Sequence, residues 1–246
     1  MRPETTPRRS EGWRGQLSLF LAVYVVYNLA RWLFVGDLDA ASQHARWIVA
    51  LEQSAGVAIE RPIQDGLDSP AATRLLSYSY LAAQFIVLPG ALIWLYRRSA
   101  RDYRRLRNTV VATWLIAIPI FALFPVAPPR LADMGFIDTV SQQPGVGLTG
   151  RSTIFYNPLA AVPSLHVGFA AAVGLTLAFA LRRRWSKALA LTWPPLVALS
   201  VIATGNHYLF DIAAGLLVTG LGFAAGRLPL RRSRPEPAPL PRSAAA

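Results

Sequence analysis

Six long apolar stretches, separated by short charged segments, limit what this chain can fold into more than any other feature of its sequence. A helix of about 20 mostly apolar residues crosses the hydrocarbon core of a bilayer, and it satisfies its own backbone polar groups where lipid cannot. We therefore predict an all-α fold, an integral membrane bundle of six transmembrane helices. The predicted helices cover approximately residues 16–35, 75–96, 108–125, 164–181, 188–204 and 208–226.

The composition agrees with a membrane protein. Apolar residues make up 53% of the chain and charged residues only 15%, whereas a soluble domain is usually about 25% charged. The net charge of +12 would suit a nucleic-acid-binding protein. However, the basic residues lie in clusters between apolar stretches, so we expect no nucleic-acid partner. The absence of cysteine excludes disulfides, thiolate zinc sites and thiol nucleophiles.

The Lys and Arg clusters predict the orientation of the helices. They lie in residues 1–15, 97–107, 182–187 and 227–246, that is, before the first predicted helix and after the second, fourth and sixth, so all four are on one side of the membrane. Positively charged loops stay in the cytoplasm, so we expect both termini to be cytoplasmic in a bacterial-type plasma membrane. The segment between the first two predicted helices is acidic, and we place it outside.

We divide the chain into a basic cytoplasmic segment (residues 1–15), a membrane domain (16–226) and a tail (227–246). The tail is rich in Pro and Arg, and we expect it to be disordered. Within the membrane domain, residues of about 40–59 predict an amphipathic helix on the outer surface. His44 lies in that helix and is expected to be a solvated surface histidine. Pro194–Pro195 predicts a kink or an irregular turn in the fifth helix.

Five polar residues from distant parts of the chain are predicted to meet at the outer ends of the helices. Arg130 follows the third helix, Ser164 and His166 begin the fourth, and His207 and Asp211 begin the sixth. Each residue also has a simpler explanation: Ser164 could only cap a helix, and the histidines could be interfacial. A carboxylate inside a membrane helix, however, is costly and points to function. The four-residue spacing also puts Asp211 on the same helix face as His207, where it could orient the imidazole.

The segments "PSLH" (163–166) and "HYLFD" (207–211) resemble the second and third signature motifs of the type 2 phosphatidic acid phosphatase (PAP2) superfamily. Those motifs read Pro-Ser-x-His and Ser-Arg-x5-His-x3-Asp. The resemblance, which extends over about residues 16–226, implies a six-helix bundle with an outward-facing active site. It also implies that His207 is the nucleophile, that Asp211 orients it and that His166 is the general acid and base. Ser164 and Arg130 would bind phosphate, and no metal or other cofactor is implied.

The sequence departs from the family pattern in its cations. The first motif, Lys-x6-Arg-Pro, is absent as such, and Val201 stands where the third motif has an arginine. Arg151 and Arg31 could replace the missing phosphate-binding groups, although Arg31 could equally extend to the membrane surface without a role in the site. The altered pattern, with "APPR" before "PSLH", is more similar to the inositol-phosphorylceramide-synthase branch of the superfamily.

Three functions remain open at this point. The first is a lipid phosphatase acting on a phospholipid such as phosphatidate, or on a polyprenyl phosphate or diphosphate. The second is a phosphotransferase that passes a phosphoryl head group, for example inositol phosphate, to a hydroxyl acceptor. The third is a transporter or assembly protein that uses the fold without chemistry. We favour hydrolysis, because water is always available at an outward-facing site.

Overall fold

The computed structural model describes residues 12–33, 37–143 and 157–226. Nine α-helices account for most of these residues, and no β-strand occurs among them. The helices are α1 (Trp13–Leu33), α2 (Leu38–Ser54), α3 (Glu60–Asp65), α4 (Pro70–Ala82), α5 (Leu88–Arg98), α6 (Ala100–Leu123), α7 (Leu165–Ala180), α8 (Arg184–Ala203) and α9 (Leu209–Ala225). A π-helical segment, Ala83–Val87, joins α4 to α5, and a 3₁₀ turn, Pro129–Leu131, follows α6.

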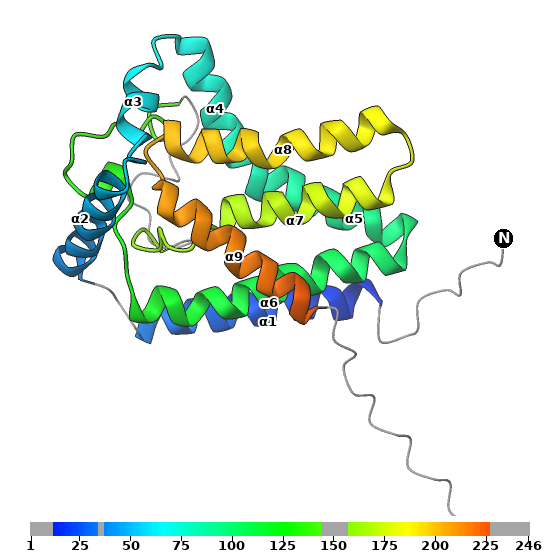
Figure 1. Cartoon of the computed structure of the whole chain (residues 1–246). Coiled ribbons are helices and arrows are strands. Elements are labelled where there is room, and N and C mark those ends of the chain that lie inside the picture. Colours follow the sequence, from blue (N-terminus) through cyan, green and yellow to red (C-terminus); the bar gives the residue numbers. More distant parts are fainter. Residues whose placement is uncertain (1–11, 34–36, 144–156, 227–246) are drawn as a thin grey trace, which may run out of the picture.

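The long helices lie alongside one another, and α2 and α3 cover one end of the bundle (Figure 1). Helix α7 is central and packs against α6, α8 and α9. Its small and apolar residues from Val167 to Val173 are all buried. The turns between α5 and α6 and between α7 and α8 lie at the opposite end from α2 (Figure 1). These turns contain the arginine clusters, so charge is separated along the bundle as the sequence predicts.

Where the structure describes them, the six predicted spans coincide with helical structure, and the chain is an integral membrane protein. Among the described residues, three stretches are long and apolar enough to cross a bilayer: Pro70–Arg98, Ala100–Leu123 and Arg184–Ala203. Helices α7 and α9 are apolar but have only 16 and 17 residues, which makes each of them about 25 Å long. A hydrocarbon core is about 30 Å thick. The six-span topology and its orientation therefore remain predictions.

Proline lies inside two helices without a break, at Pro119 in α6 and at Pro194 and Pro195 in α8. The predicted irregular turn at Pro194–Pro195 is absent, because α8 continues through both residues. Pro194 cannot donate to the carbonyl of Ala190, and this carbonyl and the Pro194 ring both lie against Gly174 of α7. A side chain at Gly174 would occupy the space that the proline ring needs.

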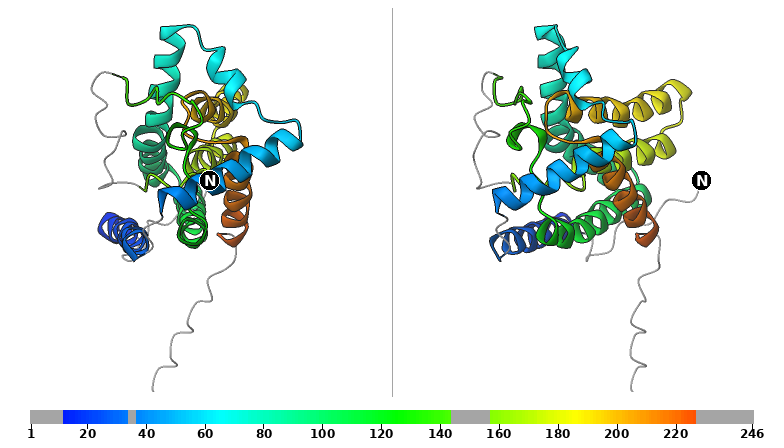
Figure 2. Two further views of the ribbon diagram at one scale, coloured as in Figure 1. Left: turned by 90° about the vertical axis from the view of Figure 1, so that its left-hand side faces the viewer. Right: turned by 60° about the vertical axis from the view of Figure 1, so that its left-hand side comes forward.

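The outer helix differs from its prediction in two ways. The helix predicted for about 40–59 is shorter than expected: α2 ends at Ser54, and a separate helix, α3, begins only at Glu60 (Figure 2). One face of α2, formed by Ala41, Ala45, Ile48 and Glu52, is buried against the bundle. The expectation that His44 is simply solvated is wrong. Its Nδ1 lies 2.7 Å from the carbonyl oxygen of Pro125, and its ring stacks on Phe124 with 4.3 Å between centroids.

Close packing of α7 and α9 predicts a contrast between two glycines of α9. A methyl group at Gly215 would overlap the backbone carbonyl of Ser164, whereas a methyl group at Gly220 would meet nothing within 4 Å. We expect Gly215→Ala to destabilise the protein by about 1–3 kcal/mol through overpacking. Gly220→Ala should be neutral or slightly stabilising, because alanine favours helix. Thermal unfolding in detergent measures both, and equal midpoints for the two variants would contradict this packing.

Candidate active site

His207 and Asp211 form the predicted pair at the start of α9. The Nδ1 of His207 lies 3.1 Å from Oδ2 of Asp211. The same carboxylate oxygen accepts a hydrogen bond of 2.9 Å from the backbone N–H of Tyr208. Asp211 is fully buried and His207 is 6% exposed. Because Nδ1 faces the carboxylate, Nε2 is the ring nitrogen left to react.

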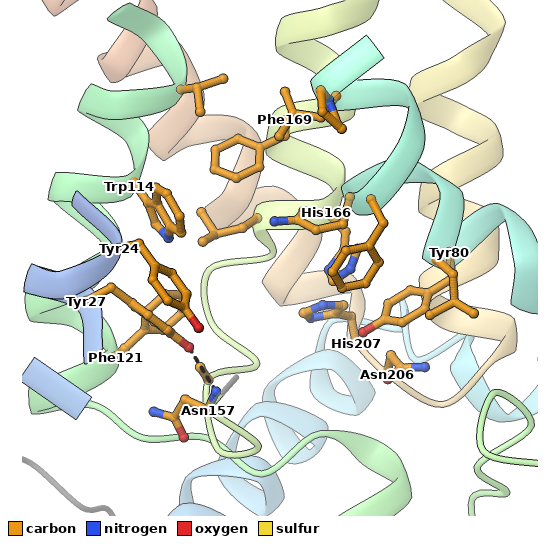
Figure 3. A pocket seen from close by; sticks show the side chains of 18 of the residues that line it. Tyr24, Tyr27, Tyr80, Trp114, Phe121, Asn157, His166, Phe169, Asn206 and His207 are labelled. Atoms are coloured by element: carbon orange, nitrogen blue, oxygen red, sulfur yellow. Dashed lines mark hydrogen bonds between the residues drawn. The ribbon is translucent and has the colours of Figure 1, made fainter. Parts of the chain in front are cut away.

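His166 faces this pair from the first turn of α7. The ring centroids of His166 and His207 are 6.0 Å apart. Tyr80 of α4 stacks on the other side of His166, with 4.2 Å between centroids. Figure 3 shows the two imidazoles next to each other, with Tyr80 beside them. Both histidines line the same pocket, so both rings border the space in which a phosphate group could lie.

Ser164 precedes α7 as its N-cap residue, as predicted, but its side chain does not cap the helix. Its backbone N–H donates to the carbonyl oxygen of Asp211 at 3.0 Å. Its Oγ is buried and has no hydrogen-bond partner within the described part of the chain. This hydroxyl therefore has a donor that no described residue uses.

Arg130 lies in the 3₁₀ turn after α6, and this turn places it at the site. Its backbone N–H donates to the carbonyl oxygen of Gly205 at 2.9 Å, in the turn just before His207. Its side chain is 5% exposed, and Nε lies 3.3 Å from the Asp138 carboxylate. That contact is an ion pair and not an aligned hydrogen bond. Nη1 is buried without a hydrogen-bond partner among the described residues, so the guanidinium has a donor to spare.

The other cations predicted for the site are not placed there by the structure. Arg151 lies outside the described residues, and Arg31 is in α1 but its side chain lies outside them as well. Val201 is fully buried in α8. Its carbonyl oxygen accepts hydrogen bonds from the backbone N–H groups of Asn206 and His207, at 3.0 and 3.1 Å. The backbone of Val201 therefore holds the turn before His207, and it can do so with any side chain at this position.

An apolar pocket of about 940 Å³ opens onto the two histidines. Figure 3 shows aromatic side chains of α1, α4 and α6 around it, among them Tyr24, Tyr27 and Trp114. Leucine and phenylalanine side chains of α1 and α5 continue the wall. The polar lining residues are few; besides the tyrosines and tryptophan they are Gln84, Arg130, Asn157, His166, Asn206 and His207.

Several lining residues were not found by the sequence motifs. Tyr80 and Asn206 lie beside the predicted histidines and line the pocket (Figure 3), but neither is part of a pattern that identifies a site. Gln84 is a polar residue of the π-helical segment between α4 and α5. In the structure it lines the pocket, and its Oε1 is buried without a partner in the described chain. An isolated polar residue in a membrane helix was the available signal.

A family model described as the PAP2 superfamily matches residues 46–225. The chain belongs to this superfamily. The fold is also similar to the crystal structure of Aquifex aeolicus LpxE, with a TM-score of 0.52 and 17% sequence identity. That similarity covers 68% of this chain and 92% of the Aquifex protein. No curated protein matches this chain.

The His207–Asp211 geometry predicts a severe defect for Asp211→Asn. An asparagine can no longer stabilise a cationic imidazole, and it can favour the wrong tautomer of His207. We expect kcat to fall between about 10² and 10⁴-fold. Asp68→Asn is the matched control, because Asp68 is exposed in the connection between α3 and α4. Unchanged kcat in Asp211→Asn, measured with any substrate of the wild type, would contradict this role.

Proposed function

We propose that this chain is a membrane-embedded, metal-independent phosphatase that acts on a lipid phosphate or diphosphate through a phosphohistidine intermediate. The observation that carries the proposal is the position of the His207–Asp211 pair opposite His166, at the polar end of an apolar pocket. Membership of the PAP2 superfamily supports a phosphatase-type enzyme. The pocket supports a substrate with a hydrocarbon chain, because its wall is almost entirely apolar.

The proposed first step transfers the phosphoryl group from the substrate to His207. Nε2 of His207 attacks phosphorus while the bond to the lipid oxygen breaks, and protonated His166 gives its proton to that oxygen. Asp211 holds Nδ1 and stabilises the positive charge that develops on the ring. The lipid alcohol leaves, and the phosphoryl group remains on nitrogen.

The second step releases the phosphoryl group to water. His166, now neutral, takes a proton from the attacking water as oxygen bonds to phosphorus and the P–N bond breaks. Inorganic phosphate leaves, and both histidines return to their starting states. Arg130 and the hydroxyl of Ser164 would bind the phosphate oxygens in both steps, because each has a buried donor to spare. A guanidinium suits this task because it can donate two parallel hydrogen bonds.

We propose that the site faces outside the cytoplasm. The arginine-rich turns lie at the opposite end of the bundle from α2 and α3 (Figure 1). Positively charged loops remain cytoplasmic. Because α2 and α3 pack on the first turn of α9, the histidines belong to the other end.

The alternative that the structure also supports is transfer to a hydroxyl acceptor. Ser164 and Asp211 are fully buried, and His207 is nearly so, which limits the access of bulk water. The resemblance of the "APPR … PSLH" pattern to the inositol-phosphorylceramide-synthase branch points the same way. The catalytic groups would be the same, and only the acceptor in the second step would differ. A transporter without chemistry would have no need of the His207–Asp211 geometry.

Phosphate release by the purified protein in detergent tests the proposal directly. The panel contains phosphatidate, lysophosphatidate, farnesyl diphosphate and undecaprenyl diphosphate, with EDTA present. We expect release from at least one lipid by the wild type and none by His207→Ala. Dependence on added Mg²⁺ would overturn metal independence. When farnesyl diphosphate is the donor, phosphatidate formed from added diacylglycerol, or inositol phosphate formed from added inositol, without free phosphate, would establish transfer.

Helix α5 offers a matched test of the lipid pocket. Leu92 lines the pocket, whereas the neighbouring Ile93 is 55% exposed on the outer side of the same helix. Leu92→Trp should fill the space and raise KM several-fold for long-chain substrates, with less effect on short-chain ones. Ile93→Trp should change neither. Steady-state kinetics with dioctanoyl and dioleoyl phosphatidate measures both, and an equal effect on the two chain lengths would rule out this pocket as the chain-binding site.

A further inference from the structure

Three carboxylates bind three successive backbone N–H groups at the start of α9. Asp211 accepts from Tyr208 at 2.9 Å, Glu60 accepts from Leu209 at 2.7 Å, and Glu52 accepts from Phe210 at 2.7 Å. The N-terminus of a helix has unpaired N–H groups and a partial positive charge. Asp211 belongs to α9 itself, but the two glutamates reach it from α2 and α3.

The two glutamates are buried, where an ionised side chain has an unfavourable free energy. Glu52 is 3% exposed and Glu60 is 4% exposed. Oε2 of Glu52 is buried and has no hydrogen-bond partner in the described chain. The charges that act on Glu52 come from Glu60 of α3 and Asp211 of α9, and both are acidic. Tyr208, beside them, is the other ionisable group that these carboxylates face.

Glu52 is the carboxyl group that holds a proton. Burial raises the pKa of Glu52 from 4.5 to about 7, against the opposing hydrogen bond from Phe210, and the charge of Glu60 raises it further. At pH 6 Glu52 therefore retains its proton. The protonated carboxyl group can donate to Glu60 and still accept from the N–H of Phe210.

We propose that protonated Glu52 shares its proton with Glu60 through a hydrogen bond and that the two act as positioning residues, holding the first turn of α9 so that the His207–Asp211 pair meets His166. The catalytic part of this inference rests on the proposed function, and the shared proton does not. His207 and Asp211 lie on either side of the three N–H groups that the carboxylates bind. Any movement of this turn therefore moves the imidazole relative to His166, which is on a different helix.

The shared proton makes the turn sensitive to alkaline pH. The folded protein holds the proton more tightly than the unfolded chain, because the pKa of Glu52 is raised on folding. The stabilisation is therefore complete below pH 4.5 and is lost as the pH rises through about 7. Above that pH, Glu52 carries a negative charge beside Asp211. This repulsion weakens the attachment of α2 to the start of α9.

Glu52→Gln removes the titratable proton of Glu52 but keeps the hydrogen bond from Phe210. A glutamine still accepts from Phe210 and can donate to Glu60, so it imitates protonated Glu52 at every pH. We expect the unfolding midpoint of the wild type in detergent to fall between pH 5 and pH 8. That of Glu52→Gln should fall less, so that it exceeds the wild type at pH 8. Asp68→Asn should follow the wild type, and parallel curves for Glu52→Gln and the wild type would overturn the shared proton.

Turnover of dioctanoyl phosphatidate tests the positioning role. We expect kcat of the wild type to decline as the pH rises above about 7, and Glu52→Gln to extend activity to higher pH with unchanged KM. Glu52→Ala removes the acceptor for Phe210 and should lower kcat by about 100-fold. If Glu52→Ala fails to fold, Glu52→Gln still decides the question, because an unchanged alkaline limb would overturn the proposal.

A failure of the proposed function is distinguishable from a failure of this inference. If the wild type hydrolyses no lipid, modification by diethyl pyrocarbonate replaces turnover as the measure of the His207 environment. The chain has only three histidines, so mass spectrometry resolves each one. In the wild type, His207 should become more reactive as the pH passes from 6 to 8.5, relative to His44. Glu52→Gln should suppress that relative increase, and an identical increase in both proteins would overturn the positioning role.

Discussion

The contact between the start of α7 and the first turn of α9 is the interaction on which the site depends. A hydrogen bond of 3.0 Å joins the backbone N–H of Ser164 to the carbonyl oxygen of Asp211. Two backbones approach this closely only because Gly215 has no side chain to separate them. His166 is two residues from Ser164, and His207 is four residues from Asp211. The relative position of the two histidines therefore follows from this contact.

The apolar pattern was sufficient to predict the helices, because in lipid the length of an apolar run sets the length of the element. The His207–Asp211 pairing was also predictable, because both residues lie on one short stretch where helical periodicity decides which side chains meet. The convergence of Arg130 and Ser164 on them followed from the order of the predicted spans. In each case a local or topological rule was enough.

The remaining features depend on contacts between distant segments that no local pattern encodes. His44 reads as a surface residue of an amphipathic helix, but the carbonyl of Pro125 and the ring of Phe124 engage it. Glu52 and Glu60 read as part of an acidic outer segment, and their N–H partners lie about 150 residues further along the chain. The continuity of α8 through Pro194 likewise depends on Gly174 of another helix.

The depth of the site gives the pocket a second role beyond holding a hydrocarbon chain. Ser164 and Asp211 are fully buried, and α2 and α3 cover the start of α9. Under the proposed function, an acceptor would therefore reach phosphorus along the same pocket as the lipid. The histidines would activate water and an alcohol in the same way. The choice between them would then rest on polar groups that line the pocket, Gln84, Asn157 and Asn206, which lie outside both signature motifs.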